Sequence, residues 1–448
     1  MKKQFLLFAF VLSIINWQIS FAITRVTLEE LNQWILYQGQ RVILTTPMVV
    51  CNSFRDTVLL ASERLFVPEE NAAGLATGDS TELFAIRAYN TAHSLRLVCK
   101  APYYLNLGAT VRNIEATVTG ERTLMTGKTP SFKNYKPSPR VPKSGKNDLR
   151  VCGANIQNYF VHQGGYATRN ITHQQHELQR LKVSSALVRI NADLYALCEL
   201  EKGPSAPAEL AAAMNQVAHK DIYDYIRTDE KDGDTISVGF IYRTDHVRPI
   251  GELRFAYQKP SIYRYRFMLQ GFEDIRTGAQ FVVSLNHPRS KRGDPALSNN
   301  LRLDNITSIF NCIDSAYVDG TYSDPDILWL GDYNCYRCEQ PIQAIVSAGY
   351  EDLLTGIEKD YSYSYRGECG SLDRVFASPS MEEQVVSVHH LHWNTDIYYS
   401  AGFKSKYNFK DINSTVPIEK NLTQQAKKNL LYRYSDHDPI LVILRLKP

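Results

Sequence analysis

An acid and an imidazole stand side by side near the C-terminus of the 448-residue chain, in the run Tyr434-Ser-Asp436-His437-Asp438-Pro439. They directly precede the last apolar run, Ile440–Leu446. A carboxylate beside an imidazole can hold a cation or a water molecule and can move a proton near neutral pH. We therefore expect Asp436 to bind a metal ion or water and His437 to act as a general base.

A second group of polar residues, Gly331-Asp332-Tyr-Asn334, follows the apolar run Ile327–Leu330. Gly331 permits a sharp exit from a strand, and Asp332 and Asn334 then point the same way because they are two residues apart. Together they are suited to hold an attacking water and a phosphate oxygen. An ordinary Gly-Asp turn is the alternative interpretation.

Two more polar side chains stand at the ends of apolar runs, namely Asn155 and Glu199. Burying an unpaired carboxylate costs too much free energy, because the charge loses its contact with water. Glu199 therefore needs a partner, either a divalent cation or a neighbouring Lys or Arg. Asn155 is suited to a metal-bound water or a phosphate oxygen, or else it caps a turn. Polar residues at strand ends are where layered α/β enzymes place their chemistry.

His287 ends another apolar run, Phe281–Leu285, and Arg289, Lys291 and Arg292 follow it. This basic neighbourhood predicts a contact with a phosphate or a leaving group, with Arg289 and Lys291 binding phosphate, although a lone histidine is more often structural. Asp373, which precedes a short apolar run, is expected to orient a histidine.

The elements that must position these residues alternate along the chain. Strands are expected at Leu149–Ile156, Leu194–Leu200, Ile236–Tyr242, Phe281–Leu285, Ile327–Leu330 and Ile440–Leu446, and helices at His173–Ile190, Ser205–Val217 and Leu301–Ile313. Alternation of strands and helices predicts a layered α/β domain over residues 148–448.

In this order, the motifs Asn155, Glu199, Gly331–Asn334, Leu372-Asp373 and Ser435–His437 resemble those of the endonuclease/exonuclease/phosphatase superfamily. That superfamily includes pancreatic-type deoxyribonucleases, abasic-site endonucleases, inositol polyphosphate phosphatases and bacterial sphingomyelinases. The resemblance covers about residues 148–448 and is strongest to secreted bacterial nucleases that carry an N-terminal domain like the oligonucleotide/oligosaccharide-binding (OB) fold. It implies a four-layered α/β sandwich with two packed mixed sheets.

The resemblance also implies roles at the metal site and at the reacting water. Glu199 is similar to the family's metal ligand, with Asn155 and Asp436 completing the shell of the metal and its water. The expected ion is Mg²⁺, with Mn²⁺ or Ca²⁺ as alternatives. Asp332 would orient or deprotonate the attacking water, and Asn334 would hold a phosphate oxygen.

Histidine and tyrosine roles follow from the same resemblance. His437 would be the general base or a transition-state stabiliser, and Asp373 would fix its tautomer. His287 matches the family's second histidine, and Tyr242 resembles a phosphate-contacting tyrosine. Some secreted members have a disulfide whose counterpart here would be Cys338–Cys369.

The segment His389–Asp396 is rich in ligand types and is not explained by these roles. Some family members carry an Asn and an acid near this position. A solvated strand and turn is the competing interpretation.

The N-terminal part, residues 23–127, is expected to be a small OB-like barrel. The box Thr27-Leu-Glu-Glu30 predicts a short helix with Leu31 and Ile35 on one face. Short strands are expected at Val42–Leu44, Thr57–Leu60, Leu83–Arg87, Leu95–Cys99 and Thr110–Val118. Residues 128–147 are rich in proline and lysine and predict an extended linker. Its basic residues either serve solubility alone or contact a phosphate backbone beside the active site.

A signal peptide is expected at residues 1–22, since Lys2 and Lys3 precede an apolar run too short to span a bilayer and Ser20-Phe-Ala22 resembles a cleavage site. This predicts a secreted or periplasmic protein without a membrane anchor after cleavage. Eight cysteines in an oxidising compartment suggest disulfides, and Cys51–Cys99 is the first pair expected, since both lie in the N-terminal part.

The net charge of +3 excludes a protein that coats nucleic acid by bulk charge. Without a Ser or Cys nucleophile motif or a glycine-rich phosphate loop, the residues favour direct attack by water. The first hypothesis is a secreted, metal-dependent endonuclease that acts on DNA, or on RNA, without sequence preference. The alternatives are a phospholipid or small-molecule phosphate hydrolase, such as a sphingomyelinase or an inositol or sugar phosphatase, and a non-catalytic binding protein on the same fold.

Overall fold

The computed structural model describes residues 23–70, 78–100, 104–135, 137–162, 170–228, 235–256 and 266–447. The expected signal peptide, residues 1–22, lies outside the described residues and stays a prediction. Among the helices described, none is long and apolar enough to cross a membrane.

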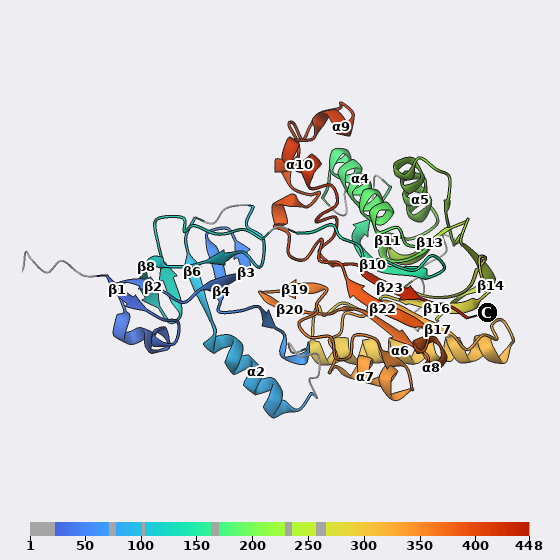
Figure 1. Ribbon diagram of the computed structural model, residues 1–448, viewed down its shortest axis with the longest axis horizontal. Coiled ribbons are helices and arrows are strands. Elements are labelled where there is room, and N and C mark those ends of the chain that lie inside the picture. Colours follow the sequence, from blue (N-terminus) through green and yellow to red (C-terminus); the bar gives the residue numbers. More distant parts are fainter. Residues whose placement is uncertain are drawn as a thin grey trace, which may run out of the picture.

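Residues from Leu149 onward form two six-stranded sheets that pack face to face (Figure 1). The first has the order β12-β13-β11-β10-β23-β22, with the bounds Tyr223–Tyr225, Ile236–Arg243, Leu194–Glu201, Leu149–Tyr159, Ile440–Leu444 and Val385–His390. The second has the order β14-β15-β16-β17-β21-β18, with the bounds Val247–Phe255, Phe267–Asp274, Gln280–Asn286, Ile327–Asp332, Asp373–Ala377 and Glu351–Asp352. Both sheets are mixed, because β10–β11 and β16–β17 pair in parallel and the remaining neighbours pair antiparallel.

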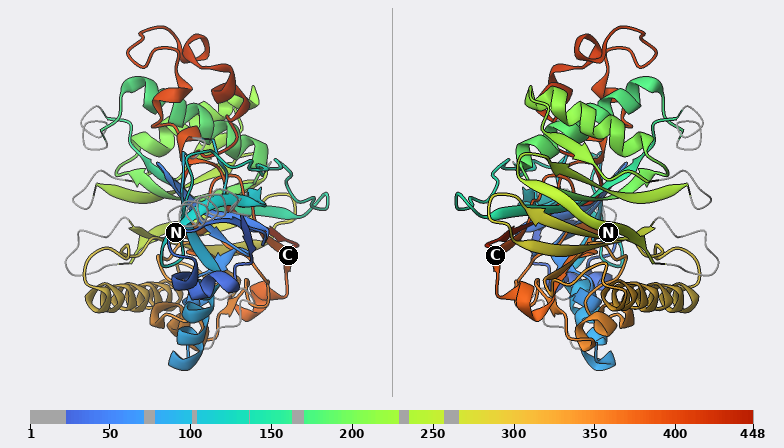
Figure 2. Two further views of the ribbon diagram at one scale, coloured as in Figure 1. Left: turned by 90° about the vertical axis from the view of Figure 1, so that its left-hand side faces the viewer. Right: turned by 90° about the vertical axis from the view of Figure 1, so that its right-hand side faces the viewer.

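Helices cover the outer face of each sheet (Figures 1 and 2). The first sheet carries α4 (His173–Ile190) and α5 (Ser205–Ala218), and the second carries α6 (Pro295–Val318) and α7 (Gln340–Ser347). Because both faces of each sheet are covered, the central strands are apolar nearly throughout. The predicted four-layered α/β sandwich with two packed mixed sheets is confirmed.

Local signals explain why the two long helices begin where they do. Thr172 and Gln175 form a reciprocal capping box at the start of α4, and Asn191 ends that helix in the left-handed conformation. Asp294 caps α6, and Pro295 takes the first helical position, where its missing N–H is not needed.

The N-terminal part forms an eight-stranded sheet around a core of its own. Its order is β1-β2-β8-β9-β6-β4-β3-β7, with the bounds Thr24–Val26, Arg41–Leu44, Ile114–Gly120, Thr123–Met125, Ser94–Val98, Thr57–Ala61, Met48–Phe54 and Thr110–Val111. The OB-like assignment and the domain boundaries at 23–127, 128–147 and 148–448 stay predictions. The described linker residues, 128–135 and 137–147, form no helix or strand apart from a bridge of Lys133 to Thr110.

Three expectations for the N-terminal part need correction. The strand expected at Leu83–Arg87 lies inside helix α2 (Ser80–Ala92), because Asp79 caps that helix and accepts from two of its first amides. The strand expected at Thr110–Val118 breaks at Asn113, whose φ is 51°. Ile35 belongs to the 3-10 helix Glu30–Tyr37 but is 72% exposed instead of sharing the buried face of Leu31.

The N-terminal part is tied to the sandwich by strand β5 (Leu65–Phe66). It pairs in parallel with β20 (Glu368–Gly370), which forms a hairpin with β19 (Tyr363–Tyr365). Next to it, the buried Glu70 accepts hydrogen bonds from Arg374 Nη1 at 2.7 Å and from the amide of Arg337 at 2.9 Å. The two parts therefore meet through backbone pairing and a buried ion pair.

The predicted disulfides are both wrong. All eight cysteines lie in described residues and are unbridged. Cys51 lies in a small cluster with Leu65, whereas Cys99 belongs to the core of the N-terminal sheet. Cys369 packs with Phe66, and the amide of Cys338 donates to the carbonyl of Glu69, and neither thiol is bridged.

Several short elements complete the described residues. They are the helices α8 (Pro379–Glu382), α9 (Ile418–Asn421) and α10 (Gln424–Lys428) and the 3-10 turns Pro68–Glu70, Tyr399–Ala401 and Lys406–Asn408.

Candidate active site

The chemically interesting residues meet at one edge of the sandwich. Asn155 lies on β10 and Glu199 near the end of β11, while Asp332 ends β17 and His287 follows β16. Asp373 begins β21 directly opposite Asp332 in the antiparallel pairing, and His437 comes just before β23. This edge joins the carboxyl ends of both parallel pairs, which is where layered α/β folds gather functional side chains.

Oxygen Oδ2 of the buried Asp332 lies at the centre of this group. Asn155 Nδ2 donates to it at 3.0 Å and also to Glu199 Oε1 at 3.1 Å. The Nε2 atoms of His287 and His437 lie 3.7 Å and 3.9 Å from the same Asp332 oxygen. Three side chains from both sheets thus converge on one carboxylate oxygen.

His437 is held by a carboxylate from the side away from Asp332. Its Nδ1 lies 2.7 Å from Asp373 Oδ2. Burial alone lowers the pKa of His437, but the charges of Asp373 and Asp332 and the Asp373 hydrogen bond outweigh burial, so the pKa lies well above the ordinary value. The ring of Tyr363 packs against the imidazole with 4.6 Å between ring centroids. The dyad therefore fixes both the position and the charge of the imidazole.

Two other titratable groups at this edge have shifted pKa values. Burial raises the pKa of Asp332 to about 7, and the nearby Asp373 charge adds to this while His437 opposes it. Burial, with the positive charges of Arg266 and His437, holds the pKa of His287 well below its ordinary value. Asp332 is thus poised to exchange a proton near neutral pH, and His287 is a neutral imidazole able to ligate a cation.

The backbone at these strand ends departs from regular structure. Glu199 sits at a β-bulge between Cys198 and Leu200 with a φ of 67°, and a bulge re-aims a side chain at a strand end. Gly331 has a φ of 146°, and a Cβ atom there would lie 1.8 Å from the carbonyl oxygen of Asn286. Only glycine fits at this position, and it places Asp332 in the centre of the site.

Three side chains at this edge can share a cation. Ligand atoms of Glu199, His287 and Asp332 all lie within 4.8 Å of one another. This donor set fits a divalent ion, because the two carboxylates are hard oxygen ligands and neutral imidazole is a common nitrogen ligand. The expected set of Glu199, Asn155 and Asp436 stays a prediction, and Glu199 is common to both sets. The half-buried Asp436 instead lines a neighbouring cavity.

Asn334, Arg289 and Lys291 were all expected to bind phosphate. Asn334 lies beside Asp332, with its amide donating to Asp332 Oδ1 at 2.9 Å and its Nδ2 to the carbonyl of Pro288 at 3.2 Å. Lys291 forms an ion pair with Glu339 and lies 4.7 Å from the ring centroid of Tyr336. The backbone of Arg289 contacts Asn305. Asn334 is therefore part of the site, whereas Lys291 already has a carboxylate partner.

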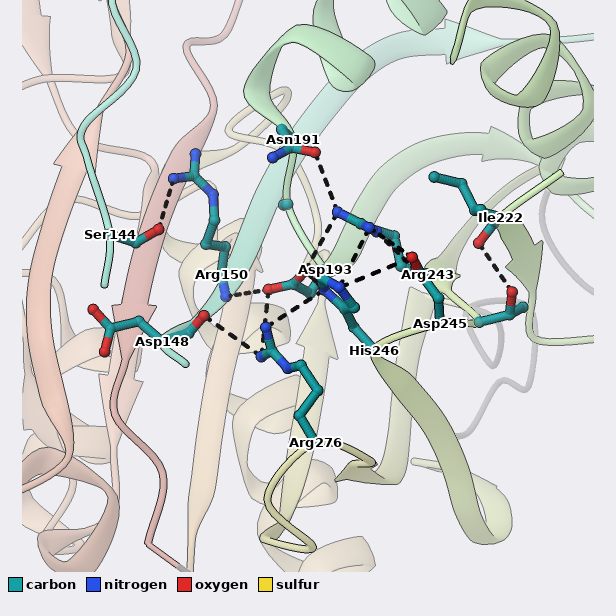
Figure 3. A network of polar contacts seen from close by, with 12 residues as sticks. Ser144, Asp148, Arg150, Asn191, Asp193, Ile222, Arg243, Asp245, His246 and Arg276 are labelled. Carbon is teal, nitrogen blue, oxygen red and sulfur yellow. Dashed lines mark hydrogen bonds and ion pairs between the residues drawn. The ribbon is translucent and has the colours of Figure 1, made fainter. Parts of the chain in front are cut away.

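The structure separates Tyr242 from the site, and this expectation is corrected. Tyr242 pairs with Leu194 at the beginning of β11, whereas Glu199 lies near the end of that strand. Strand β13 runs antiparallel to β11, so its last residues lie at the opposite edge of the sheet. That edge is closed by a structural network around the buried Asp193, whose carboxylate contacts His246 Nδ1 at 2.6 Å and the amide of Arg150 at 2.9 Å (Figure 3).

A layer of buried polar residues behind His437 was missed in the sequence. Asn394 Nδ2 donates to the carbonyl of His437 at 2.6 Å, and Asp438 accepts from the amides of Asn394 and Thr395. His390 contacts the carbonyl of Asp373 at 3.0 Å. Three of these residues belong to the ligand-rich segment His389–Asp396, so its composition was the available signal. The solvated strand and turn considered for that segment is wrong, because its polar groups position the dyad.

A cavity of about 720 Å³ opens beside the site. Its lining includes Tyr363, Thr395, Arg433 and Asp436. This volume falls in the range of about 300–1,000 Å³ found for ligand sites.

No protein-family model matches the chain, and no curated protein matches it. Similar solved structures include an endonuclease/exonuclease/phosphatase family protein from Bacteroides thetaiotaomicron, with 18% identity, 70% of this chain and 100% of that chain covered, and a TM-score of 0.42. A mannosyl-6-phosphatase from the same species has 18% identity, coverage of 66% and 100%, and a TM-score of 0.41. The catalytic domain of human nocturnin has 10% identity, coverage of 67% and 94%, and a TM-score of 0.42. The solved structures similar to this chain thus include proteins described as members of the endonuclease/exonuclease/phosphatase family.

Proposed function

We propose that this protein is a divalent-metal-dependent phosphodiester hydrolase that acts on nucleic acid by direct attack of water. The observation that carries the proposal is the convergence on Asp332 Oδ2 of Asn155 Nδ2 at 3.0 Å, His287 Nε2 at 3.7 Å and His437 Nε2 at 3.9 Å. A phosphodiester is anionic and resists attack, so its hydrolysis needs positive charge, a base and a positioned water together. These side chains supply all three within one buried corner.

Asp332 is the proposed base. Its carboxylate lies at the centre of the site, with the imidazoles of His287 and His437 at 3.7 Å and 3.9 Å, where an attacking water is within reach. His437 was expected to be the base or a stabiliser of the transition state, and its raised pKa favours the second role. Fixed by Asp373 at Nδ1, the imidazolium donates from Nε2 to a phosphate or leaving-group oxygen. Asn155 and Asn334 orient the acceptor oxygens around this centre.

Glu199 and His287 would hold the metal ion, which we propose to be Mg²⁺, with Mn²⁺ or Ca²⁺ able to take its place, and Asp332 would act on the water beside it. When bound, the ion supplies positive charge that neutralises the phosphate and lowers the barrier to attack. Asp436 faces the adjoining cavity, where it is suited to an outer water ligand.

A polyanionic chain is the favoured substrate, because arginines line the cavity next to the site. Arg55, Arg366 and Arg433 all contribute to its walls. A phospholipid or small-molecule phosphate hydrolase is the alternative on the same catalytic residues. A non-catalytic binding protein is disfavoured, because binding alone does not need a base, a carboxylate-backed imidazole and a cation site in one corner.

Export is part of the proposal. The N-terminal sequence has the features of a cleaved signal peptide, so we propose that the mature enzyme is secreted or periplasmic and is not anchored in a membrane. Mass determination of the N-terminus after expression with export would check this. Retention of residues 1–22 would contradict it.

A panel of substrates tests the proposed function. Purified mature protein with Mg²⁺ is incubated separately with single-stranded DNA, duplex DNA, RNA, sphingomyelin vesicles and a hexose phosphate. Hydrolysis of nucleic acid that EDTA abolishes is the expected result. Release of phosphocholine or inorganic phosphate with intact nucleic acid would assign the alternative function.

A further inference from the structure

The cavity beside Asp436 is built jointly by the N-terminal part and the sandwich. One wall is the turn between β3 and β4, at Phe54 and Arg55. The turn between β19 and β20 also lines the cavity, at Tyr365 and Arg366. Figure 1 shows the β19–β20 hairpin reaching from the sandwich toward the N-terminal sheet.

The two turns present the same pair of side chains. Strand pairing closes at Phe54–Thr57 and at Tyr365–Glu368, so each aromatic residue is the last of its strand and an arginine follows it. Both arginines adopt a positive φ, 55° for Arg55 and 54° for Arg366. Each guanidinium lies over the preceding ring, 5.1 Å and 5.2 Å from the two ring centroids.

These rings are exposed although they line a cavity. Phe54 is 67% exposed, Tyr365 is 55% exposed, and a third ring on the same cavity, that of Tyr399, is 71% exposed. Exposed rings with arginines beside them are the combination that binds single-stranded nucleic acid, because bases stack on the rings and phosphates pair with the guanidinium groups.

We propose that the Phe54-Arg55 and Tyr365-Arg366 turns form a clamp for a single-stranded segment of nucleic acid that leads into the catalytic centre. This inference rests on the proposed function and specifies its substrate. A paired duplex hides the faces of its bases in the stack, so the clamp selects single strands, strand ends or unpaired regions.

The clamp is continuous with the reacting groups. Tyr365 lies two residues along β19 from Tyr363, whose ring packs on His437 with a centroid separation of 4.6 Å. Two residues of a strand span about 7 Å, the length of about two stacked nucleotides. A base stacked on Tyr365 therefore belongs to a nucleotide close to the scissile phosphate.

The N-terminal part holds the two turns at a fixed separation. A Cβ atom on Gly367 would lie 2.4 Å from Leu59 Cδ2 and 3.4 Å from Cys51 Cβ, so the β19–β20 turn packs directly on β3 and β4. Arg64 adds an ion pair with the buried Asp396 at 2.7 Å. The N-terminal sheet thus completes the substrate groove and is required for it.

A lipid surface is the other partner that exposed rings can bind. Here a guanidinium group lies beside each ring, and the rings share one cavity with Asp436, which favours a threaded strand over a flat membrane. The experiment therefore includes a vesicle arm.

The test compares the full mature chain with the variants Phe54→Ala/Tyr365→Ala and Arg55→Ala/Arg366→Ala. The matched control is Phe84→Ala/Arg41→Ala, which removes an exposed ring and an exposed arginine that do not line the cavity. Cleavage is measured with Mg²⁺ on a single-stranded oligonucleotide, on its duplex and on bis(p-nitrophenyl) phosphate, a small diester that does not reach the clamp. Binding to the oligonucleotide and to sphingomyelin–phosphatidylcholine vesicles is measured with EDTA present.

The wild type is expected to prefer the single strand over the duplex by at least about tenfold. Each clamp variant is expected to raise KM for the oligonucleotide by about tenfold or more, since one base–ring stack contributes about 1–3 kcal/mol. Neither variant changes the rate on bis(p-nitrophenyl) phosphate, and the control matches the wild type on every substrate.

Three results would overturn the clamp: a preference for duplex, an unchanged oligonucleotide KM in both variants, or vesicle binding that the ring variant alone abolishes. Failure of the proposed function looks different, because the wild type would then cleave no diester at all. In that case the binding measurement still tests the clamp. Oligonucleotide binding by the wild type that both variants lose would support the clamp, and no oligonucleotide binding by the wild type would overturn it.

Discussion

Nδ1 of His437 lies 2.7 Å from Asp373 Oδ2, and this contact decides that Nε2 is the nitrogen that faces Asp332. Burial alone would lower the pKa of His437, and the Asp373 carboxylate opposes this and keeps the imidazole charged. The same pair joins the two sheets, because Asp373 begins a strand of the second sheet and His437 precedes a strand of the first. The catalytic centre is therefore assembled only when the sandwich closes.

Removal of the dyad should abolish turnover without unfolding the protein. We expect His437→Ala to lower kcat by about 10²–10⁴-fold, as for other groups that transfer or share a proton in the transition state. Asp373→Asn keeps the shape but removes the charge, so its kcat should fall as well and by less. The matched control is His173→Ala on the exposed start of α4, which should keep full kcat.

Metal binding should depend on Glu199 and not on the next carboxylate of the same strand. Glu199 shares the cation cluster, whereas Glu201 accepts hydrogen bonds from the amides of Val161 and His162 at 2.7 Å and 3.0 Å. Titration calorimetry with Mn²⁺ should show affinity lost by at least about tenfold in Glu199→Gln, because a ligand is removed. Equal affinity in Glu199→Gln and Glu201→Gln would contradict the assigned ligand set.

Gly331→Ala should destabilise the fold and misplace Asp332. Its new Cβ would meet the carbonyl oxygen of Asn286 at 1.8 Å, so the strand end must move. We expect the free energy of unfolding to drop by about 2–4 kcal/mol in urea titrations. Gly120→Ala is the control, because no atom lies within 4 Å of its added Cβ, and a change near 0 kcal/mol (within about 0.5) is expected there.

Glu70 should matter for stability although it belongs to the N-terminal part. Its loss leaves the fully buried Arg374 with Asp352 as its remaining carboxylate partner, at 2.6 Å. Removing one partner of a buried ion pair lowers the free energy of unfolding by about 3–5 kcal/mol. The Glu70→Ala variant should therefore unfold at a clearly lower urea concentration. Glu69→Ala removes only the exposed pair with Arg87 and should cost no more than about 1 kcal/mol.

Lys182 should make stability rise with pH. Burial, helped by the charge of Arg433, lowers the pKa of Lys182 to about 7 in the native state from 10.5. Between these values the unfolded chain binds a proton that the native chain lacks, so the free energy of unfolding increases with pH. Below pH 7 both states are charged, and the destabilisation is fully present.

The measurement is the difference in unfolding free energy between Lys182→Met and the wild type at several pH values. This difference should shrink by about 4 kcal/mol as the pH rises from 7 to 10.5. Lys220→Met, at an exposed position, should show a difference that does not change with pH. A constant difference for Lys182→Met as well would disprove the shifted pKa.

Strand ends of the sandwich were predictable because apolar runs that are covered on both faces stand out in the sequence. Helix α4 was predicted with its observed bounds from apolar residues at helical spacing, such as Leu178 and Leu187. Asn155, Glu199, Asp332, Asp373, His287 and His437 were all named from their places at run ends, and the structure brings them together. The meeting of these residues at one site depends on the packing of two sheets, which no local pattern encodes.

Other features were not accessible for physical reasons. Tyr242 was assigned by motif likeness, and only the antiparallel direction of β13 shows that it lies at the far edge. Helix α2 was taken as a strand because its short apolar run outweighed the capping signal at Asp79. The sequence around Asn394 and Asp438 is typical of a polar surface. Only the tertiary structure shows that these side chains are buried and hold His437 in place.

Conversion of supercoiled plasmid to open circles by the purified mature protein tests the central claim most directly. Wild type is assayed with Mg²⁺ and with EDTA, beside His437→Ala and its control His173→Ala. Nicking that needs the metal, persists in the control and disappears in His437→Ala is the predicted result. An intact plasmid with wild type and Mg²⁺, or equal nicking by His437→Ala, would contradict hydrolysis at this site.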